Sequence, residues 1–357
     1  MNQDFAYRLP AEWEPQWGVQ LTWPHAGTDW KPYLEDITDT YIKMAQAIAQ
    51  RERLLVVCPH AEAVRALLSG KVKRENVTIC ECPTDDTWAR DHGFITLLPS
   101  CRSASASADG QRQRLLDFRF NGWGEKFKAD NDNAINRRLF DADTLGRLAA
   151  DYESHLDFVL EGGSIESDGQ GTVFTTTGCL MAPHRNQPLT QQEIEEQLKT
   201  RLHARRVLWI DYGHLAGDDT DGHIDTLVRI APDDTLLYIY TDDVDDEHYA
   251  DLQAMKAQLA TFRTLDGRPY RLLGLPLPQA LYDDGERLPA TYANFLVVNG
   301  AVLVPTYGQP EIDSVAVGII QQAFPDHEMI PIDSSTIVRQ HGSIHCCTMQ
   351  FPQYNPE

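Results

Sequence analysis

The sequence predicts a mixed α/β fold in which a β-hairpin, a helix and a further strand form a unit that occurs five times. Three observations support this prediction. The unit returns about every 50 to 70 residues, a period typical of radial or stacked arrays. A hydrogen-bonding or ionisable residue stands at the start of each unit's first strand. The fifth unit, from Ser343, has no return strand of its own, so we expect the N-terminal strand to pair with it and close a ring.

The N-terminal part supplies a strand and a helix. Residues 19–23 alternate between apolar and polar and stop at Pro24, as expected of a strand. Asp36 is a candidate N-cap of the helix, whose apolar face is formed by Ile37, Tyr41, Met44, Ala45 and Ile48. The apolar runs 54–58 and 77–82 predict two more strands, with a short helix at 61–68 between them.

Four hairpin units follow along the chain. The predicted hairpins cover residues 91–120, 161–175, 222–240 and 292–305, and each is followed by a helix and a strand ending near residues 160, 210, 273 and 332. Asp168-Gly169 and Asn299-Gly300 are strong tight-turn signals, and Thr190 to Glu193 is a capping box. The repetitive polar run 103–108 is expected to be a mobile loop. The last strand is expected to span residues 342–350, and the whole of 1–357 to form one catalytic domain.

Composition excludes several classes of protein. The net charge of −22 disfavours nucleic acid as a partner and favours a cationic ligand, although an acidic surface also serves solubility. No apolar run is long enough to span a membrane. The N-terminus lacks the pattern of a secretory signal, and seven irregularly spaced cysteines are a poor disulfide framework, so we expect a cytoplasmic protein. No zinc motif is present, and we expect neither a metal nor a cofactor.

Six polar residues mark the starts of the units, and they suggest one shared site because buried polar groups need partners. They are Asp91, Glu161, His223, Asp225, Asn294 and Cys346. Carboxylates gathered around a planar cation form a natural receptor for a guanidinium. A bound guanidinium would stabilise a Cys346 thiolate, and His223 could protonate departing ammonia and then deprotonate a water.

Several motifs resemble those of the agmatine deiminases, which share their fold with the catalytic domain of Porphyromonas-type peptidylarginine deiminases. They are residues 87–91, 120–124, 160–164, 218–225 and 344–346, together with Pro10 to Trp13 and Trp23-Pro24, so that the resemblance covers nearly the whole chain. It implies a five-bladed pseudo-symmetric α/β propeller of the guanidine-modifying superfamily. The implied reaction is agmatine plus water giving N-carbamoylputrescine and ammonia.

The resemblance also assigns roles. Cys346 resembles the nucleophile that forms a covalent amidino intermediate, and His223 resembles the general acid and base. Glu161 resembles the carboxylate that orients this histidine, and Asp91 and Asp225 resemble the pair that holds the guanidinium nitrogens. Two positions depart from the family pattern: Ser343 stands where Asn is frequent, and Cys347 follows the nucleophile directly. Strand alternation would place Cys347 on the opposite face, in the core.

The remaining candidates concern the substrate. Trp88 and Trp123 are either plain core or walls that stack on the substrate. Asn294 either contacts the substrate or bonds the backbone. The acidic cluster before His223 is either a solvated turn or the partner of an ammonium, with Asp218 or Asp219 as the candidate, which would favour agmatine over arginine. The alternatives are a peptidylarginine deiminase, a non-catalytic guanidinium-binding propeller and a cysteine amidinotransferase. A homo-oligomer is compatible with the sequence.

Overall fold

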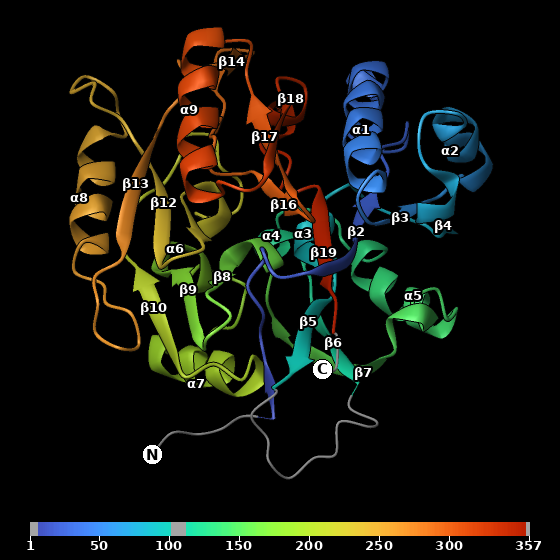
Figure 1. Ribbon diagram of the computed structural model, residues 1–357, viewed down its shortest axis with the longest axis horizontal. Coiled ribbons are helices and arrows are strands. Elements are labelled where there is room, and N and C mark those ends of the chain that lie inside the picture. The colour runs from blue at the N-terminus through green and yellow to red at the C-terminus, as the bar shows by residue number, and fades with distance from the viewer. Residues whose placement is uncertain (1–5, 101–111, 355–357) are drawn as a thin grey trace.

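The computed structural model describes residues 6–100 and 112–354, so the run 103–108 lies outside the described residues. Strands occupy the interior of the molecule, and helices α1, α2, α5, α7, α8 and α9 lie around its outside (Figure 1). Within the described residues, no helix combines the length and the apolar character needed to cross a membrane.

The predicted unit recurs five times: two antiparallel strands, a helix, and a strand parallel to the second. The first unit consists of β5 (Ile95–Pro99), β6 (Gln113–Arg119), α5 (Ile135–Asp141) and β7 (Ala150–Val159). The second consists of β8 (Ile165–Ser167), β9 (Thr172–Thr176), α7 (Gln191–Arg201) and β10 (Arg206–Ile210). The third consists of β11 (Val228–Ala231), β12 (Thr235–Tyr240), α8 (Tyr249–Leu259) and β13 (Arg271–Pro276). The fourth consists of β16 (Leu296–Val298), β17 (Ala301–Thr306), α9 (Pro310–Ala323) and β18 (Glu328–Asp333).

The fifth unit joins the two ends of the chain, as predicted. The C-terminal strand β19 (Thr348–Pro352) pairs antiparallel with β2 (Gln16–Thr22), with Thr348 opposite Leu21. Figure 1 shows this red strand beside the blue one near the middle of the molecule. The unit continues with α1 (Leu34–Ala49) and β3 (Arg53–Cys58), and is extended by α2 (Ala61–Leu68) and β4 (Val77–Glu81).

Smaller elements connect the units. The short strand β1 (Tyr7–Arg8) pairs with β5, and β14 (Tyr282–Asp283) pairs with β15 (Glu286–Arg287). The short helices are α3 (Ala89–His92), α4 (Gly122–Glu125) and α6 (Thr177–Leu180). The single 3₁₀ turns are η1 (Lys31–Tyr33), η2 (Arg74–Asn76), η3 (Asp132–Ala134), η4 (Gly146–Leu148), η5 (Gly162–Ser164), η6 (Ile224–Thr226) and η7 (Ile337–Gln340).

Local sequence signals explain several of these elements. Thr190 and Glu193 form the expected capping box at the start of α7. Asn299-Gly300 makes the two-residue turn between β16 and β17, and Gly300 takes the positive φ that this turn requires. The buried residues of α1 include the five that were predicted. They pack in one core cluster with Leu21 of β2 and Val56 of β3, so an amphipathic helix covers a sheet.

Three predicted boundaries are wrong. Helix α1 begins at Leu34, with Tyr33 in the N-cap position, so Asp36 lies in the first turn, where a negative charge still favours the helix N-terminus. The sequence pattern of residues 135–148 predicts one helix, but α5 ends at Asp141 and is followed by turns in which Asp143 and Ala149 have positive φ. The first strands of the units begin later than predicted, because the polar residues expected on them occupy turns instead.

Candidate active site

The predicted polar residues share one structural position, the turn directly before the first strand of a unit. Helix α3, η5 and η6 are these turns in the first three units, and irregular turns take their place before β16 and β19. Short turns fix side-chain direction without continuing the strand ladder, so each side chain can point away from its sheet. The residues placed in this way are Asp91, Glu161, His223, Asp225, Asn294 and Cys346.

Four of these side chains converge beside Gly163. A Cβ atom built on Gly163 would lie 2.6 Å from His223 Nδ1, 2.9 Å from Asp91 Oδ1 and 3.1 Å from Asp225 Oδ2. His223 Nδ1 lies 3.7 Å from Asp91 Oδ1, and the Cys346 Sγ lies 3.8 Å from Asp225 Oδ2. The structure thus brings the predicted nucleophile, base and carboxylate pair together.

A cavity of about 210 Å³ opens onto this point. Asp91 and Cys346 line its inner part, and Trp88 and Trp123 form walls. Trp123 also donates from Nε1 to Asp91 Oδ2 at 3.0 Å, so this ring both walls the cavity and holds a carboxylate. The other lining residues are Asp29, Asp86, Phe127, Asp219, Thr220, Thr226, Gln340, His341 and Gly342.

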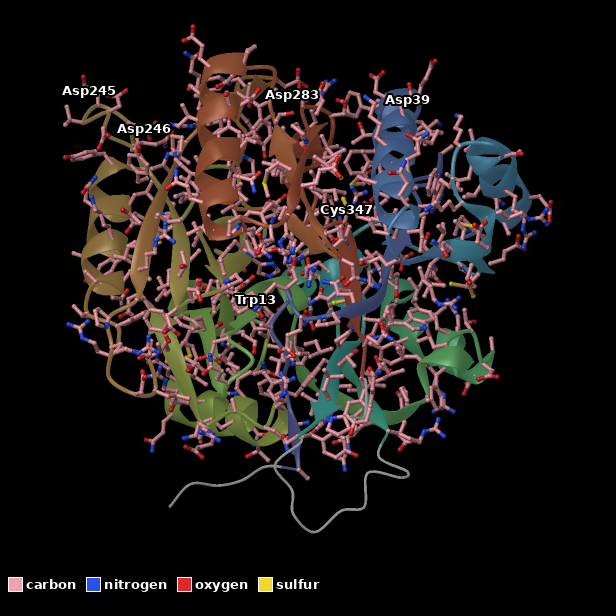
Figure 2. All side chains as sticks on the ribbon, viewed as in Figure 1. Trp13, Asp39, Asp245, Asp246, Asp283 and Cys347 are labelled. Carbon is pink, nitrogen blue, oxygen red and sulfur yellow. The ribbon has the colours of Figure 1, made fainter. Side chains whose placement is uncertain are left out.

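Cys346 lies in a turn, not on the predicted strand of residues 342–350. The backbone N–H of Cys347 donates to Ile344 O, and strand β19 begins only at Thr348. The argument from strand alternation therefore does not apply to Cys347, although its side chain is fully buried in a hydrophobic cluster, as predicted. Figure 2 shows Cys347 in the interior, whereas Asp39 and Asp245 lie at the edge of the molecule.

The Cys346 thiol is held in its neutral form. Burial raises its pKa well above the ordinary value, and the negative charges of Asp225 and Asp91 raise it further. A backbone hydrogen bond involving Ser343 acts in the opposite direction. A cation bound between the two carboxylates would cancel their effect, so the arrangement favours ionisation of the thiol only when a positive ligand is present.

The pKa values of His223 and Asp91 are both raised above their ordinary values. Burial lowers the pKa of the His223 imidazole, but Asp91, Cys179 and Asp225 outweigh burial and raise it to about 10. Burial raises the pKa of Asp91 to about 6, with Asp225 and Glu161 adding to the rise and His223 opposing it. Both ring nitrogens of His223 are buried without a hydrogen-bond partner. The imidazolium is thus a proton donor available to a ligand.

Glu161 is paired differently from the expectation. Its carboxylate accepts from Arg185 Nε at 3.1 Å, and both side chains are 0% exposed. Arg185 also donates to Asp221 Oδ2 at 2.7 Å and to Thr220 O at 2.8 Å, so it ties Glu161 to the loop before His223. The Glu161 carboxylate still lies within 4.8 Å of a His223 ring nitrogen.

Two candidate substrate contacts, Asp218 and Asn294, form hydrogen bonds to backbone groups around them. Asp218 accepts from the backbone N–H groups of Thr220 and Gly222, at 3.0 and 2.6 Å, and so stabilises its own loop. Asn294 accepts from the Cys346 N–H at 3.2 Å and donates to Asp225 O at 3.3 Å, so it links the turn of the nucleophile to η6. Neither residue lines the cavity, whereas Asp219 does.

Sequence reasoning missed the charged residues behind the site. They are Arg185, Arg229 and His345, which are buried, and Glu12, whose side chain is 8% exposed. Each is bonded to a predicted residue or to another of the four. A signal existed for Arg229, because a charge inside the apolar run of β11 needs a buried partner. His345 adjoins the nucleophile in sequence, but nothing local indicated its partners.

Two buried trios carry donor atoms of the kinds that bind metal ions: Glu161, Cys179 and His223, and Glu12, Glu166 and His345. In the first trio the carboxylate already pairs with Arg185. In the second, both carboxylates pair with Arg229. A guanidinium beside each trio disfavours a further cation, so the donor sets do not fit a resident metal well.

Two comparisons of the sequence with known proteins indicate the same family. The profile of the family described as "Porphyromonas-type peptidyl-arginine deiminase" matches residues 8–352. The chain is 33% identical to an agmatine deiminase of Pseudomonas aeruginosa, with 97% of this chain and 95% of that one covered.

Two solved structures share the mixed α/β fold. One, a Porphyromonas gingivalis protein described as a candidate arginine deiminase, is 49% identical over 97% of this chain and 98% of the other, with a TM-score of 0.88. The other, a C. jejuni agmatine deiminase variant with substrate bound, is 34% identical over 98% of each chain, also with a TM-score of 0.88. On its sequence and its fold, the chain belongs to the Porphyromonas-type peptidyl-arginine deiminase family.

Proposed function

We propose that this protein hydrolyses agmatine to N-carbamoylputrescine and ammonia. The observation that carries the proposal is the charge of the cavity. Four carboxylates, of Asp29, Asp86, Asp91 and Asp219, line it, and no Lys or Arg does so among the described residues. Agmatine is a dication, so both of its ends meet negative charge, whereas the carboxylate of free arginine would meet four carboxylates and no Lys or Arg among the described lining residues.

The reaction would begin at the guanidinium. Asp91 and Asp225 hold its nitrogens, and its charge lowers the pKa of the Cys346 thiol, which burial and these two carboxylates keep high in the free protein. The Cys346 thiol gives its proton to solvent, the Sγ thiolate forms a bond to the guanidino carbon, and His223 gives a proton to the departing nitrogen. Loss of ammonia leaves a cationic amidino thioether. The neutral His223 then takes a proton from water, the hydroxide adds to the carbon, and the C–S bond breaks to give the urea and the thiol.

We also propose that the chain forms a closed ring of five units. Five units of one pattern, with β19 paired to β2, support a five-bladed α/β propeller closed by the N-terminal strand, built as one catalytic domain from residues 1–357. Free cysteines among the described residues fit a reducing compartment such as the cytoplasm.

Mass spectrometry of the protein quenched during turnover tests the chemistry. We expect an adduct on Cys346 with the mass of agmatine less one ammonia, absent in Cys346→Ala. A bare amidino group, formed when the diamine leaves in place of ammonia, would instead identify an amidinotransferase. An absence of both the adduct and released ammonia would leave a guanidinium-binding protein.

Substrate comparison tests the choice of agmatine. We expect kcat/KM for agmatine to exceed that for arginine and for a peptidyl-arginine. Burial raises the pKa of Asp219, so an ammonium beside it would be favoured. Asp219→Asn should therefore raise KM for agmatine about tenfold and leave KM for n-butylguanidine, which lacks the amine, unchanged. A preference for peptidyl-arginine would refute this assignment.

A further inference from the structure

The two oxygens of Asp225 have different surroundings. Oδ2 lies 2.7 Å from His345 Nδ1 and 3.8 Å from the Cys346 Sγ. Oδ1 is buried and has no hydrogen-bond partner. An unpartnered carboxylate oxygen is costly unless a ligand donates to it, so Oδ1 is the oxygen left for a guanidinium N–H. The hydrogen bond from His345 fixes which oxygen this is.

His345 is itself held on its other side. Its Nε2 lies 2.7 Å from Glu12 Oε2 and 3.1 Å from Arg229 Nη2, and its backbone N–H donates to Asn294 O at 3.1 Å. Each ring nitrogen lies 2.7 Å from a carboxylate oxygen, so the two carboxylates together fix the orientation of the ring. The ring cannot turn without losing both bonds.

Glu12 anchors this chain of contacts. Its Oε1 accepts from the Val297 N–H at 2.8 Å, and its Oε2 accepts from Arg229 Nη2 at 2.9 Å. Arg229 is fixed in turn by Glu166 at 2.6 Å and by Ala293 O at 3.1 Å. Arg229, Glu166 and His345 are buried and the Glu12 side chain is only 8% exposed, so the network has little freedom to rearrange.

We propose that His345, anchored by Glu12, is a positioning residue that holds Asp225 Oδ2 and presents Oδ1 to the guanidinium. This inference rests on the proposed function, in which Asp225 grips the substrate. It gives a role to a histidine outside the predicted catalytic set. It also gives a role to the N-terminal segment, which places Glu12 beside that histidine. His345 acts through Asp225, because its two ring nitrogens are already engaged, at 2.7 Å each, by Asp225 Oδ2 and Glu12 Oε2.

The electrostatic setting of Asp225 agrees with this role. Burial would raise its pKa, but the hydrogen bond and charge of His345, followed by the charges of His223 and Arg229, lower the pKa below the ordinary value. The charged or titratable groups that act on Asp225 are His345, His223, Arg229, Arg90, Asp91 and Cys346. Loss of His345 would therefore raise the pKa of Asp225. We expect the pKa of Asp91, about 6, to remain higher than that of Asp225.

The experiment compares two replacements of His345. The amide nitrogen of Asn can occupy the place of Nδ1 and donate to Asp225, whereas Gln extends toward Glu12 and leaves Oδ2 without a donor. The control is His248→Asn, because His248 is another buried histidine that bonds a carboxylate, Asp246, at 2.8 Å. Circular dichroism and thermal unfolding establish that each variant is folded. Should His345→Gln not fold, His345→Ala takes its place with the same expectation.

The primary readout does not need turnover. Carbon-13 NMR of protein labelled at aspartate carboxyl carbons, with the signal assigned by Asp225→Asn, follows the titration of Asp225. We expect the midpoint to rise by about one pH unit or more in His345→Gln, by less than half of that in His345→Asn, and not at all in His248→Asn. An unchanged midpoint in His345→Gln, or equal shifts in the Asn and Gln variants, would overturn the proposal.

The pH profile gives the second readout. Below pH 6 we expect log kcat/KM of the wild type to fall with a slope of about one, because Asp91 is protonated. In His345→Gln we expect the slope to approach two, because Asp225 is then protonated in the same pH range. A purely structural role would lower kcat/KM without steepening this limb, and would count against the inference. Absence of agmatine hydrolysis in the wild type would refute the proposed function alone, because the carboxyl titration decides the role of His345 separately.

Discussion

Alanine in place of Gly163 is the sharpest test of the converged site. An alanine Cβ at this position would lie 2.6 Å from His223 Nδ1, whereas ordinary contacts of a Cβ begin near 3.4 Å. The imidazole would have to move by about 0.8 Å, and Asp91 Oδ1 and Asp225 Oδ2 by somewhat less. The backbone of Gly163 is outside the left-handed region, so the substitution adds no conformational strain of its own.

The expected loss of activity follows from that displacement. Misplacing a catalytic group by about 1 Å costs on the order of a hundredfold in rate. We therefore expect kcat/KM for agmatine to fall about a hundredfold or more in Gly163→Ala, measured as ammonia release. Gly318→Ala is the matched control, because Gly318 lies in helix α9 and a Cβ there meets nothing within 4 Å. It should keep full activity and gain up to about 1 kcal/mol of stability.

Thermal unfolding separates the two possible causes of a loss. If Gly163→Ala is folded and its kcat/KM stays within about threefold of the wild type, the groups around Gly163 are not the catalytic set, and the reasoning from their convergence is wrong. A crystal structure of the variant would also show whether His223 moved.

Three further predictions concern the groups around this point. Trp123→Phe removes the N–H that donates to Asp91 Oδ2, so the pKa of Asp91, about 6, should rise and the acid limb of kcat/KM should move up by about half a pH unit. In the wild type, kcat/KM should fall as the pH drops below about 6, because a protonated Asp91 cannot hold a guanidinium; a profile flat down to pH 4.5 would contradict this. Arg185→Met leaves the buried Glu161 carboxylate unpaired and should lower the free energy of unfolding, measured in urea, by about 3 to 5 kcal/mol. The double variant Arg185→Met/Glu161→Gln should recover part of this stability. A loss below about 1 kcal/mol in Arg185→Met would be inconsistent with the buried pair.

The family resemblance of the motifs is confirmed by the comparisons with known proteins. The repeated pattern of hairpin, helix and strand is also present, together with the pairing of the two ends of the chain. These features depend on apolar periodicity and on turn residues such as Asn299 and Gly300. Both signals act over a few neighbouring positions, so they can be recognised in the sequence. The convergence of Asp91, His223 and Cys346 followed from the same logic, since equivalent positions of repeated units meet.

The sequence by itself determined the units, their order and most of the polar residues that they carry. Only the tertiary structure decided how those residues are held: Asp218 turned into its own loop, Glu161 was paired with Arg185, and Cys346 was placed in a turn ahead of its strand. The physical reason is separation along the chain. His345 and Glu12 are 333 positions apart, and a hydrogen bond between such residues leaves no periodic trace in the sequence around either of them.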